Sequence, residues 1–436
     1  MDRLNSVAFS INGNLYFKIN KTTIAQTRKA FMDFDTCNLQ DPPMPPNFVS
    51  VYHLDLLEKS KFKDYESLFT HRLTQDQARA TYLVSELRQS RDKKGINDQI
   101  LKATHVTYYQ GHYVASFVIG SERIRNFLLI DTGSYLSWWQ CAPCLPNKCY
   151  KQAFNAIYNY TTSTTFKHMD CVDESGCLNS VFRCNVDSRL CMYAQTYDNG
   201  EKTKGFLGSN IIRFVGDNTQ ARIIFGCGID QKSGTSEFGN TYSGIIALGK
   251  RLSARTPGIY SLPSQLGTNL FALCLPSAEA ATGSFITFNK APWVYGTEAK
   301  LLKNRQQPHL YYINLYKIFI NDREVPVDPT WWNGRKEDHG VIVDTGIGGV
   351  FDTCYEEVEG EEEMQFPTIR LFFGNVSVTQ ELKLERVVKN LNGYYCLAIL
   401  PWDDTQTLIG THQLQGTGLT FDLKNNALTF SVDACD

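Results

Sequence analysis

The chain contains one short pattern twice, an apolar run that ends in Asp-Thr-Gly. Phe127–Ile130 leads into Asp131, and Val341–Val343 leads into Asp344. Such runs predict buried strands that each end in a tight turn. A single Asp-Thr-Gly can arise by chance, but two copies about 200 residues apart predict two similar lobes with one carboxyl each at a shared boundary. Two carboxyls held face to face share a proton, and such a pair can activate water against a peptide carbonyl.

Length and composition exclude several classes of protein. A chain of 436 residues is too long for one ordinary core and suits two lobes with an extension. An apolar content of 42% and a charged content of 20% are typical of a globular protein. The formal net charge of −2 indicates neither a nucleic-acid nor a membrane-surface partner, and no apolar run of about 18 residues predicts a membrane span. We expect a monomer.

From Thr107 onward the sequence is typical of an all-β protein. Aromatic and β-branched residues form short runs that turn residues separate. The expected strands are Tyr108–Gly120, Phe127–Ile130, Ile211–Phe214, Ile223–Phe225, Gly244–Leu248, Phe285–Phe288, Tyr311–Leu315, Val341–Val343, Ile369–Phe373, Tyr394–Leu400, Leu419–Asp422 and Ala427–Phe430. The polar stretch Thr297–Pro308 predicts the lobe boundary. We therefore expect an all-β, bilobed fold with lobes at 107–296 and 308–436, the first carrying a cysteine-rich insertion.

The residues before the first lobe divide into two parts. Residues 1–50 give no clear prediction, whereas residues 51–106 are basic and polar. Thr74–Gln77 has the form of a capping box, and the residues behind it predict a helix with a modest apolar stripe. This helix is either a solvated surface element or part of a basic prosegment that lies over an acidic cleft.

The cysteines predict a disulfide framework. Thirteen are present, of which twelve lie from Cys141 to Cys435 and seven of those within Cys141–Cys191. An even dozen predicts six bridges and an oxidising compartment, with Cys37 left over. A zinc site at Cys141, Cys144 and Cys149 would need a second Cys-x-x-Cys unit, which the sequence lacks, so we expect no metal.

Secretion to the cell exterior or to a vacuole follows from the disulfides, yet no signal peptide is visible. The longest apolar run near the start is Val7–Phe9, too short for a signal sequence. Either the signal is missing from this version of the chain or its start is misassigned. If the chain is exported, Asn20, Asn159 and Asn375 are candidates for glycosylation.

Around both Asp-Thr-Gly segments, the sequence resembles the pepsin-like aspartic endopeptidases, in particular their plant nepenthesin-like branch. The resemblance runs from about Thr107 to Cys435 and rests on short motifs besides the twelve cysteines. These motifs are Asp131–Ser134, Trp138, Gln140–Cys144, Cys191–Gly200, Ile224–Gly228, Ser261–Leu266, Phe271–Leu275, Tyr312–Leu315, Phe351–Tyr355, Tyr395–Ala398 and Leu408–Gly410. The resemblance implies a cleft between the lobes, a protein or peptide substrate and no cofactor.

The resemblance also implies roles for individual residues. Asp131 and Asp344 would be the catalytic pair, one ionised as the base for a shared water and the other protonated toward the scissile carbonyl. The threonines would hydrogen-bond across the lobes, and Ser134 would donate to Asp131. The residues that would support the two catalytic loops are Thr132, Gly133, Ser134, Thr345 and Gly346.

A flap is implied as well, a hairpin that closes over the substrate. Tyr197 would lie at its tip, and the turn-forming residues Asp198–Gly200 support a hairpin there. Trp138 would brace Tyr197 from the first lobe.

The disulfide pairing comes from the resemblance alone, because cysteine counts cannot choose a connectivity. The implied pairs are Cys141–Cys144, Cys149–Cys227, Cys171–Cys191, Cys177–Cys184, Cys274–Cys435 and Cys354–Cys396.

The second lobe departs from the family pattern. Ile347 stands where the family has Thr or Ser, and isoleucine donates no hydrogen bond. Only four residues separate Gly346 from Phe351, where the family has a segment of a few dozen residues. Ala247 also replaces a glycine that packs on the first catalytic loop. Three hypotheses remain open: an active acid endopeptidase, an impaired or inhibitor-like binding relative, and a damaged gene copy.

Overall fold

The structure is a computed structural model, and this description covers only part of the chain. The described residues are 8–11, 14–17, 29, 32–33, 48–65, 67–68, 107–109, 112–152, 156–171, 177, 182–197, 201–214, 219–233, 242–250, 260–277, 284–305, 307–326, 340–346, 349–356, 366–373, 379–391, 394–399 and 406–435. The expected helix behind Thr74–Gln77 lies outside them, as do Cys37, Asn20, Asn375 and Ile347.

Strands dominate the described residues, which confirms the all-β prediction. Those up to the end of the first lobe are β1 (Ala8–Ile11), β2 (Asn14–Phe17), β3 (Phe48–His53), β4 (Thr107–Tyr109), β5 (Tyr113–Ile119), β6 (Ile124–Asp131), β7 (Trp138–Ala142), β8 (Tyr158–Asn159), β9 (Lys167–His168), β10 (Arg183–Asn185), β11 (Leu190–Thr196), β12 (Lys202–Arg213), β13 (Gln220–Lys232), β14 (Gly244–Ala247), β15 (Leu270–Leu275) and β16 (Ser284–Phe288).

The remaining strands belong mainly to the second lobe. They are β17 (Thr297–Leu302), β18 (Tyr311–Ile313), β19 (Leu315–Ile320), β20 (Arg323–Glu324), β21 (Gly340–Val343), β22 (Gly349–Glu356), β23 (Ile369–Phe373), β24 (Thr379–Leu382), β25 (Val388–Leu391), β26 (Tyr394–Leu397), β27 (Gln406–Ile409), β28 (Thr417–Asp422) and β29 (Ala427–Ser431). Thr297–Leu302, within the stretch expected as a polar boundary, instead forms β17 and pairs with β29.

Helices with defined bounds are few and short among the described residues. They are α2 (Leu54–Glu58), α4 (Leu262–Gln265), α5 (Thr411–Leu414) and the 3₁₀ turns η1 (Lys59–Lys61) and η4 (Leu384–Arg386). Among the described residues, no helix has the length and apolar character needed to cross a membrane.

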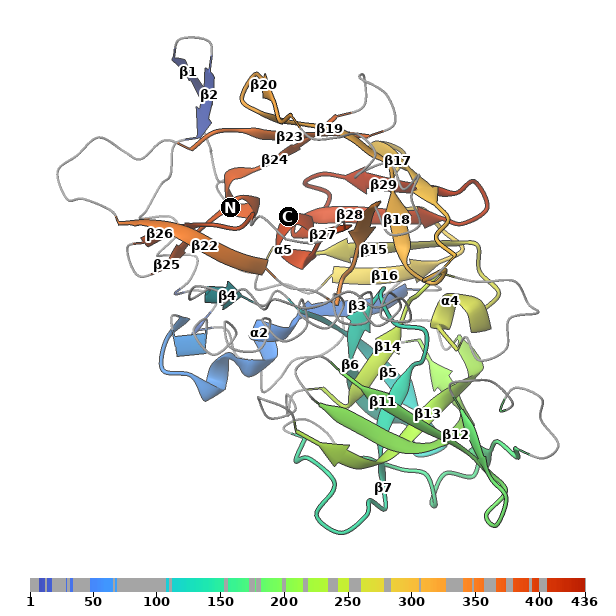
Figure 1. The fold of residues 1–436 in the computed structure, drawn as a ribbon. Coiled ribbons are helices and arrows are strands. Elements are labelled where there is room, and N and C mark those ends of the chain that lie inside the picture. The colour runs from blue at the N-terminus through green and yellow to red at the C-terminus, as the bar shows by residue number, and fades with distance from the viewer. Residues whose placement is uncertain are drawn as a thin grey trace, which may run out of the picture.

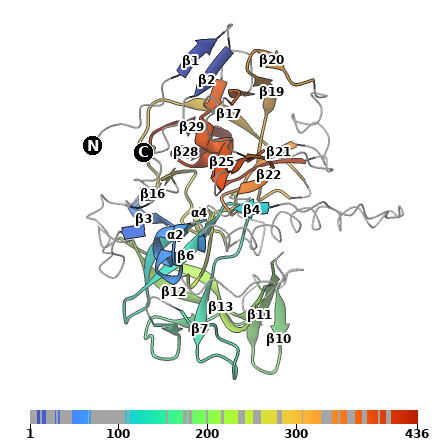
Figure 2. The same ribbon diagram turned by 90° about the vertical axis from the view of Figure 1, so that its left-hand side faces the viewer.

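Two groups of strands form the two lobes of a pepsin-like fold. Figure 1 shows the green strands β11, β12 and β13 at the bottom and the orange to red strands, from β17 to β29, at the top. The same separation is visible from the side in Figure 2. Strands β15, β16, β28 and β29 pair with one another in antiparallel order and join the lobes into one large sheet.

Strand β3 is a central part of the sheet that joins the lobes, although it was not predicted from the sequence. It pairs with β5 of the first lobe on one side and with β16 on the other. All six of its residues are buried, as expected of a strand covered on both faces. Beyond it, Leu54, Leu57 and Leu68 are buried in a core cluster that includes Leu129 of β6. The segment 48–68 is therefore an integral layer of the folded chain.

The disulfides differ from the implied pairing in the first lobe. The structure contains Cys141–Cys227, Cys144–Cys149, Cys171–Cys184, Cys177–Cys191 and Cys274–Cys435. Only the last of these was expected, and four expected pairs are wrong. Strand register explains the first exchange, because β7 runs parallel to β13 and brings the Cα atoms of Cys141 and Cys227 to 5.4 Å. Cys396 is also in a disulfide, and its cross-strand neighbour in β22 is Cys354.

Peptide mapping without reduction tests this connectivity. We expect a fragment that joins Cys141 to Cys227 and a separate short fragment closed by Cys144 and Cys149. Digestion at acidic pH keeps thiols protonated and so prevents exchange during the experiment. Recovery of a Cys149–Cys227 fragment instead would show that the pairing described here is wrong.

Candidate active site

Asp131 lies at the end of β6 and is fully buried. The backbone N–H of Gly133 donates to its Oδ1 at 2.9 Å, and the Ser134 hydroxyl donates to its Oδ2. Strand β14 runs parallel to β6 with Ala247 beside Asp131, so the alanine methyl is accommodated there without exposure. The carboxyl is thus held at both oxygens by its own loop.

Asp344 occupies the matching position in the second lobe. It follows β21, is fully buried, and its Oδ1 accepts from the Gly346 N–H at 2.8 Å. Strand β27 runs parallel to β21, as β14 runs parallel to β6, and the Asp344 N–H donates to the Ile409 carbonyl at 3.1 Å. The two Asp-Thr-Gly loops are therefore built in the same way from equivalent strands.

Two threonines tie these loops together across the lobes. The Thr132 N–H donates to the Thr345 hydroxyl at 3.2 Å, and the Thr345 N–H donates to the Thr132 hydroxyl at 2.9 Å. Each hydroxyl in turn donates at 3.4 Å to a backbone carbonyl of the opposite lobe, those of Val343 and Ile130. This reciprocal set fixes the spacing of the loops that carry the two carboxyls.

Gly133 shows how closely the two loops approach. A Cβ atom at this position would lie 2.5 Å from Oδ2 and 3.0 Å from Cγ of Asp344. Because such contacts are far below van der Waals distance, only glycine leaves room for the Asp344 carboxyl beside the Asp131 loop. The structure thus brings together the two aspartates and the loop residues that the sequence singled out.

The residues expected in the flap belong to one hairpin. Strands β11 and β12 pair from Met192 with Phe206 to Thr196 with Lys202, and the Tyr197 N–H donates to the Glu201 carbonyl at 2.8 Å. The buried Trp138 donates its indole N–H to the Tyr197 hydroxyl at 2.6 Å. The tip, Asp198–Gly200, lies outside the described residues.

Comparison with known proteins gives the family. Two family models match, "Xylanase inhibitor N-terminal" over residues 113–288 and "Xylanase inhibitor C-terminal" over residues 347–432, and together they span more than half of the chain. The chain is 24% identical to Aspartyl protease AED1 of Arabidopsis thaliana over 83% of this chain and 81% of that protein. It is 25% identical to Aspartic proteinase nepenthesin-1 of Nepenthes gracilis, over 76% of this chain and 80% of that protein. The chain belongs to the plant pepsin-like aspartic protease family.

Beside the carboxyl pair of this family member lies a histidine that the sequence reading missed. The His309 ring packs edge-on against Tyr135 at 5.2 Å and is hydrogen-bonded to the Gly133 backbone. Burial lowers the pKa of His309 to about 4, although the nearby Asp131 carboxylate works in the opposite direction. The only feature of the sequence that points to His309 is its place after the polar stretch that ends at Pro308, and such stretches are too common to predict a site.

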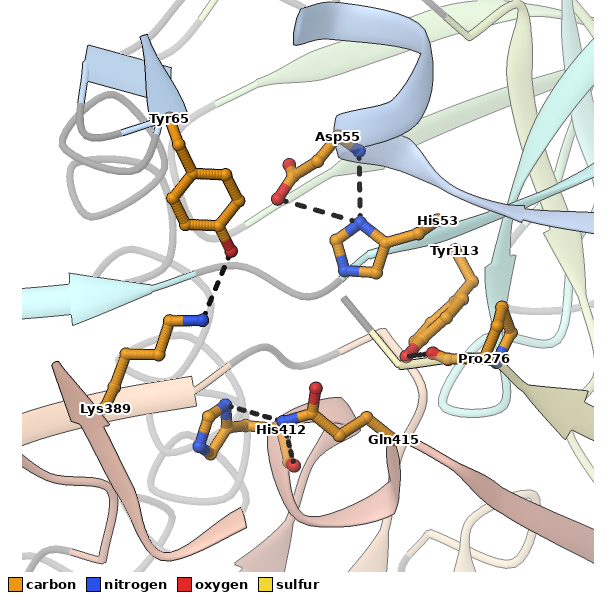
Figure 3. A network of polar contacts seen from close by, with 8 residues as sticks. All are labelled: His53, Asp55, Tyr65, Tyr113, Pro276, Lys389, His412 and Gln415. Atoms are coloured by element: carbon orange, nitrogen blue, oxygen red, sulfur yellow. Dashed lines mark hydrogen bonds and ion pairs between the residues drawn. The ribbon is translucent and has the colours of Figure 1, made fainter. Parts of the chain in front are cut away.

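The N-terminal segment meets the second lobe in a network of polar contacts (Figure 3). The Lys389 ammonium donates to the Tyr65 hydroxyl at 3.2 Å and also lies 5.3 Å from the Tyr65 ring centroid. On the N-terminal segment itself, the buried His53 Nδ1 accepts from the Asp55 N–H at 3.2 Å. The Tyr65–Lys389 contact joins the segment to the second lobe, and the pairing of β3 with β5 joins it to the first lobe.

Three other features considered from the sequence are the glycosylation candidate Asn159, a metal site and the short second loop. Asn159 is partly exposed, and its Oδ1 accepts from the N–H and the hydroxyl of Thr161. Among the described residues, no group of three or more His, Cys, Asp or Glu side chains could hold a metal ion. In the second lobe, β21 ends at Val343 and β22 begins at Gly349, so few residues separate them. Strand β22 pairs with β26 and with β4.

Proposed function

We propose that this chain is an aspartic endopeptidase that hydrolyses peptide bonds with a water held between Asp131 and Asp344. The observation that carries the proposal is the reciprocal bonding of Thr132 and Thr345, which sets two buried carboxyls on facing loops. Two carboxyls so placed hold one proton between them, which gives a base for the water and an acid for the scissile carbonyl.

The hydrogen bonds favour different roles for the two aspartates. Asp131 accepts from the Gly133 N–H and from the Ser134 hydroxyl, whereas the residue of the second loop equivalent to Ser134 is Ile347, which has no donor. Donors stabilise the ionised form of a carboxyl. Asp131, with two donors on its own loop, fits the role of the base that takes the proton from water, which leaves Asp344 to carry the proton toward the substrate carbonyl.

The flap supplies the remaining part of the mechanism. The bond from Trp138 to Tyr197 holds the Tyr197 side chain against the first lobe. Closure of this hairpin over a bound peptide would exclude bulk water and hold the scissile bond above the carboxyl pair. Substrate would lie extended between the flap and the two catalytic loops.

The N-terminal segment fits the role of a prosegment in a secreted or vacuolar zymogen. Strand β3 is fully buried between β5 and β16, and the residues after it contact both lobes through Tyr65 and Lys389. The five disulfides among the described residues suit an oxidising compartment. Release of residues 48–68 would require opening of the sheet that joins the lobes.

A catalytically impaired, inhibitor-like binding protein is the second candidate. Two observations favour it: the matching family models describe xylanase inhibitors, and Ile347 removes a donor from the second loop. Such a protein would keep the cleft and bind peptides or proteins without turnover.

A pH–rate profile on a denatured protein substrate distinguishes these candidates. We expect the rate to peak below about pH 5, because the carboxyl pair must hold one proton in the active form. A peptide with a hydroxyl that mimics the tetrahedral intermediate should abolish the activity. A peak near pH 8, or a rate that this inhibitor leaves unchanged, would overturn the assignment.

A further inference from the structure

Beside the Asp131 loop, two lysines and a histidine lie close together. The Gly249 N–H donates to the Ser134 carbonyl at 2.9 Å, so the segment that follows β14 contacts the catalytic loop. The next residue, Lys250, donates its N–H to the His309 carbonyl at 2.7 Å. The His309 ring in turn lies near Asp131, which joins this group to the candidate active site.

Lys303 is the third member of the group and lies on the same β17–β18 connection as His309. Strands β17 and β18 are paired up to Leu302 with Tyr312, so the segment that joins them carries Lys303 on one arm and His309 on the other. Lys303 is exposed, whereas Lys250 is only 9% exposed. Burial and the neighbouring Lys303 charge both lower the pKa of Lys250, which places the two ammonium groups in each other's field.

The two lysines of this group have no acidic partner in the described part of the chain, and the nearby Asp131 acts on His309. Neither Lys250 nor Lys303 has an ion pair among the described residues. The sequence shows the same segregation, since no Asp or Glu occurs between Gly249 and Gly267 or between Lys300 and Asp322. A buried lysine without an anionic partner is costly, and a ligand that brings a carboxylate would remove that cost.

We propose that Lys250 and Lys303 form a basic recess beside His309 that binds an acidic side chain of the peptide substrate next to the scissile bond. This inference rests on the proposed peptidase function and names the substrate class of that same site. A Glu or Asp side chain is the occupant that charge complementarity favours, because it can reach the lysines while its backbone lies over the carboxyl pair. At pH 5 the peptide carboxylate is largely ionised, so the attraction is present under acidic assay conditions.

Matched peptides test the recess. Fluorogenic peptides that carry Glu or Gln at one position at a time, on each side of the cleaved bond, would be compared by kcat/KM at pH 5. We expect Glu to be favoured over Gln about tenfold at one of these positions, the size of one charge-assisted contact. K303Q should reduce this ratio to near one, and K303E should make a Lys peptide the better substrate at that position.

The controls separate this inference from the proposed function. K300Q removes an exposed lysine on the adjacent strand β17 and should leave the Glu-to-Gln ratio unchanged. The same Glu and Gln peptides, made with a non-cleavable hydroxyl isostere, would be compared by their affinity in calorimetry. This measures binding at the recess without turnover. Hydrolysis with equal rates for Glu and Gln at every position would overturn the recess but keep the peptidase. Preferential binding of the Glu isostere without any hydrolysis would keep the recess and overturn the peptidase.

Discussion

Replacement of Asp344 by Asn is expected to abolish peptide hydrolysis, with a loss in kcat of at least about 1,000-fold. The amide keeps the shape and can still accept from the Gly346 N–H, but it cannot carry the proton that polarises the substrate carbonyl. Among the described residues, only Asp131 and Asp344 lie on Asp-Thr-Gly loops, so no other carboxyl could replace that of Asp344 opposite Asp131. The rate would be measured at the pH optimum on a denatured protein substrate.

Asp322→Asn is the matched control for this variant. Asp322 is an exposed aspartate of the same lobe, with 72% of its side chain exposed, and it pairs with Arg370 on the surface. Such a pair contributes little, so activity should stay near that of the unchanged protein. If Asp344→Asn kept full activity, the two-carboxyl mechanism would be wrong and the binding-protein alternative would take its place.

Replacement of His412 by Gln is expected to make the folded protein less sensitive to acid. His412 lies on α5 and is 2% exposed, and burial together with Lys389 and Arg386 lowers its pKa to about 3. Between pH 6.5 and pH 3 the unfolded chain binds a proton at this position and the folded chain does not. Stability therefore falls as pH falls, by roughly 3 kcal/mol between pH 7 and pH 4 from this one residue. Glutamine, which does not titrate, should remove that share.

Urea unfolding at pH 7 and pH 4 with intact disulfides would measure the effect. The quantity to compare is the change in unfolding free energy between the two pH values, because the contact of His412 with Gln415 also contributes at neutral pH. The same substitution at the more exposed His168, whose pKa burial lowers less, should alter this change less than His412→Gln does. An equal pH dependence in the unchanged protein and in His412→Gln would contradict the inference, as would a His412 NMR titration near pH 6.5.

The acid sensitivity has a structural consequence for the N-terminal segment. His412 lies beside Lys389, and Lys389 contacts Tyr65 of that segment (Figure 3). Acid protonation at His412 would place a third cation in a buried group that already holds Lys389 and Arg386. Because the pKa of His412 is about 3, the contact between the second lobe and residues 48–68 would weaken only near and below pH 3, and not at the pH 5 of the peptide assays.

The strands that carry the site were predictable because their physical signals are local. Phe127–Ile130 and Val341–Val343 are continuous apolar runs, and each forms a buried strand that ends at its aspartate. Strand β3 was missed for the opposite reason. Its residues Phe48–His53 follow a proline-rich stretch and precede a polar one, and only pairing with distant β5 and β16 makes them a central strand.

The sequence could not predict which side chains lie together when that depends on how distant strands pair. The exchange of disulfide partners among Cys141, Cys144, Cys149 and Cys227 depends on where β7 lies beside β13. The basic recess likewise joins Lys250 to His309 through a backbone contact between segments far apart in the chain. By contrast, Ser134 and Gly133 were predictable because they follow Asp131 directly and act on its own loop.

The most direct test of the central claim is an experimental structure with a hydroxyl-bearing peptide isostere in the cleft. The account predicts that this hydroxyl lies within hydrogen-bonding distance, about 2.6–3.2 Å, of a carboxyl oxygen of both Asp131 and Asp344. The Thr132 and Thr345 bonds should be intact in the same structure. An isostere bound elsewhere, or carboxyl groups more than about 7 Å apart, beyond the reach of one bridging water, would contradict it.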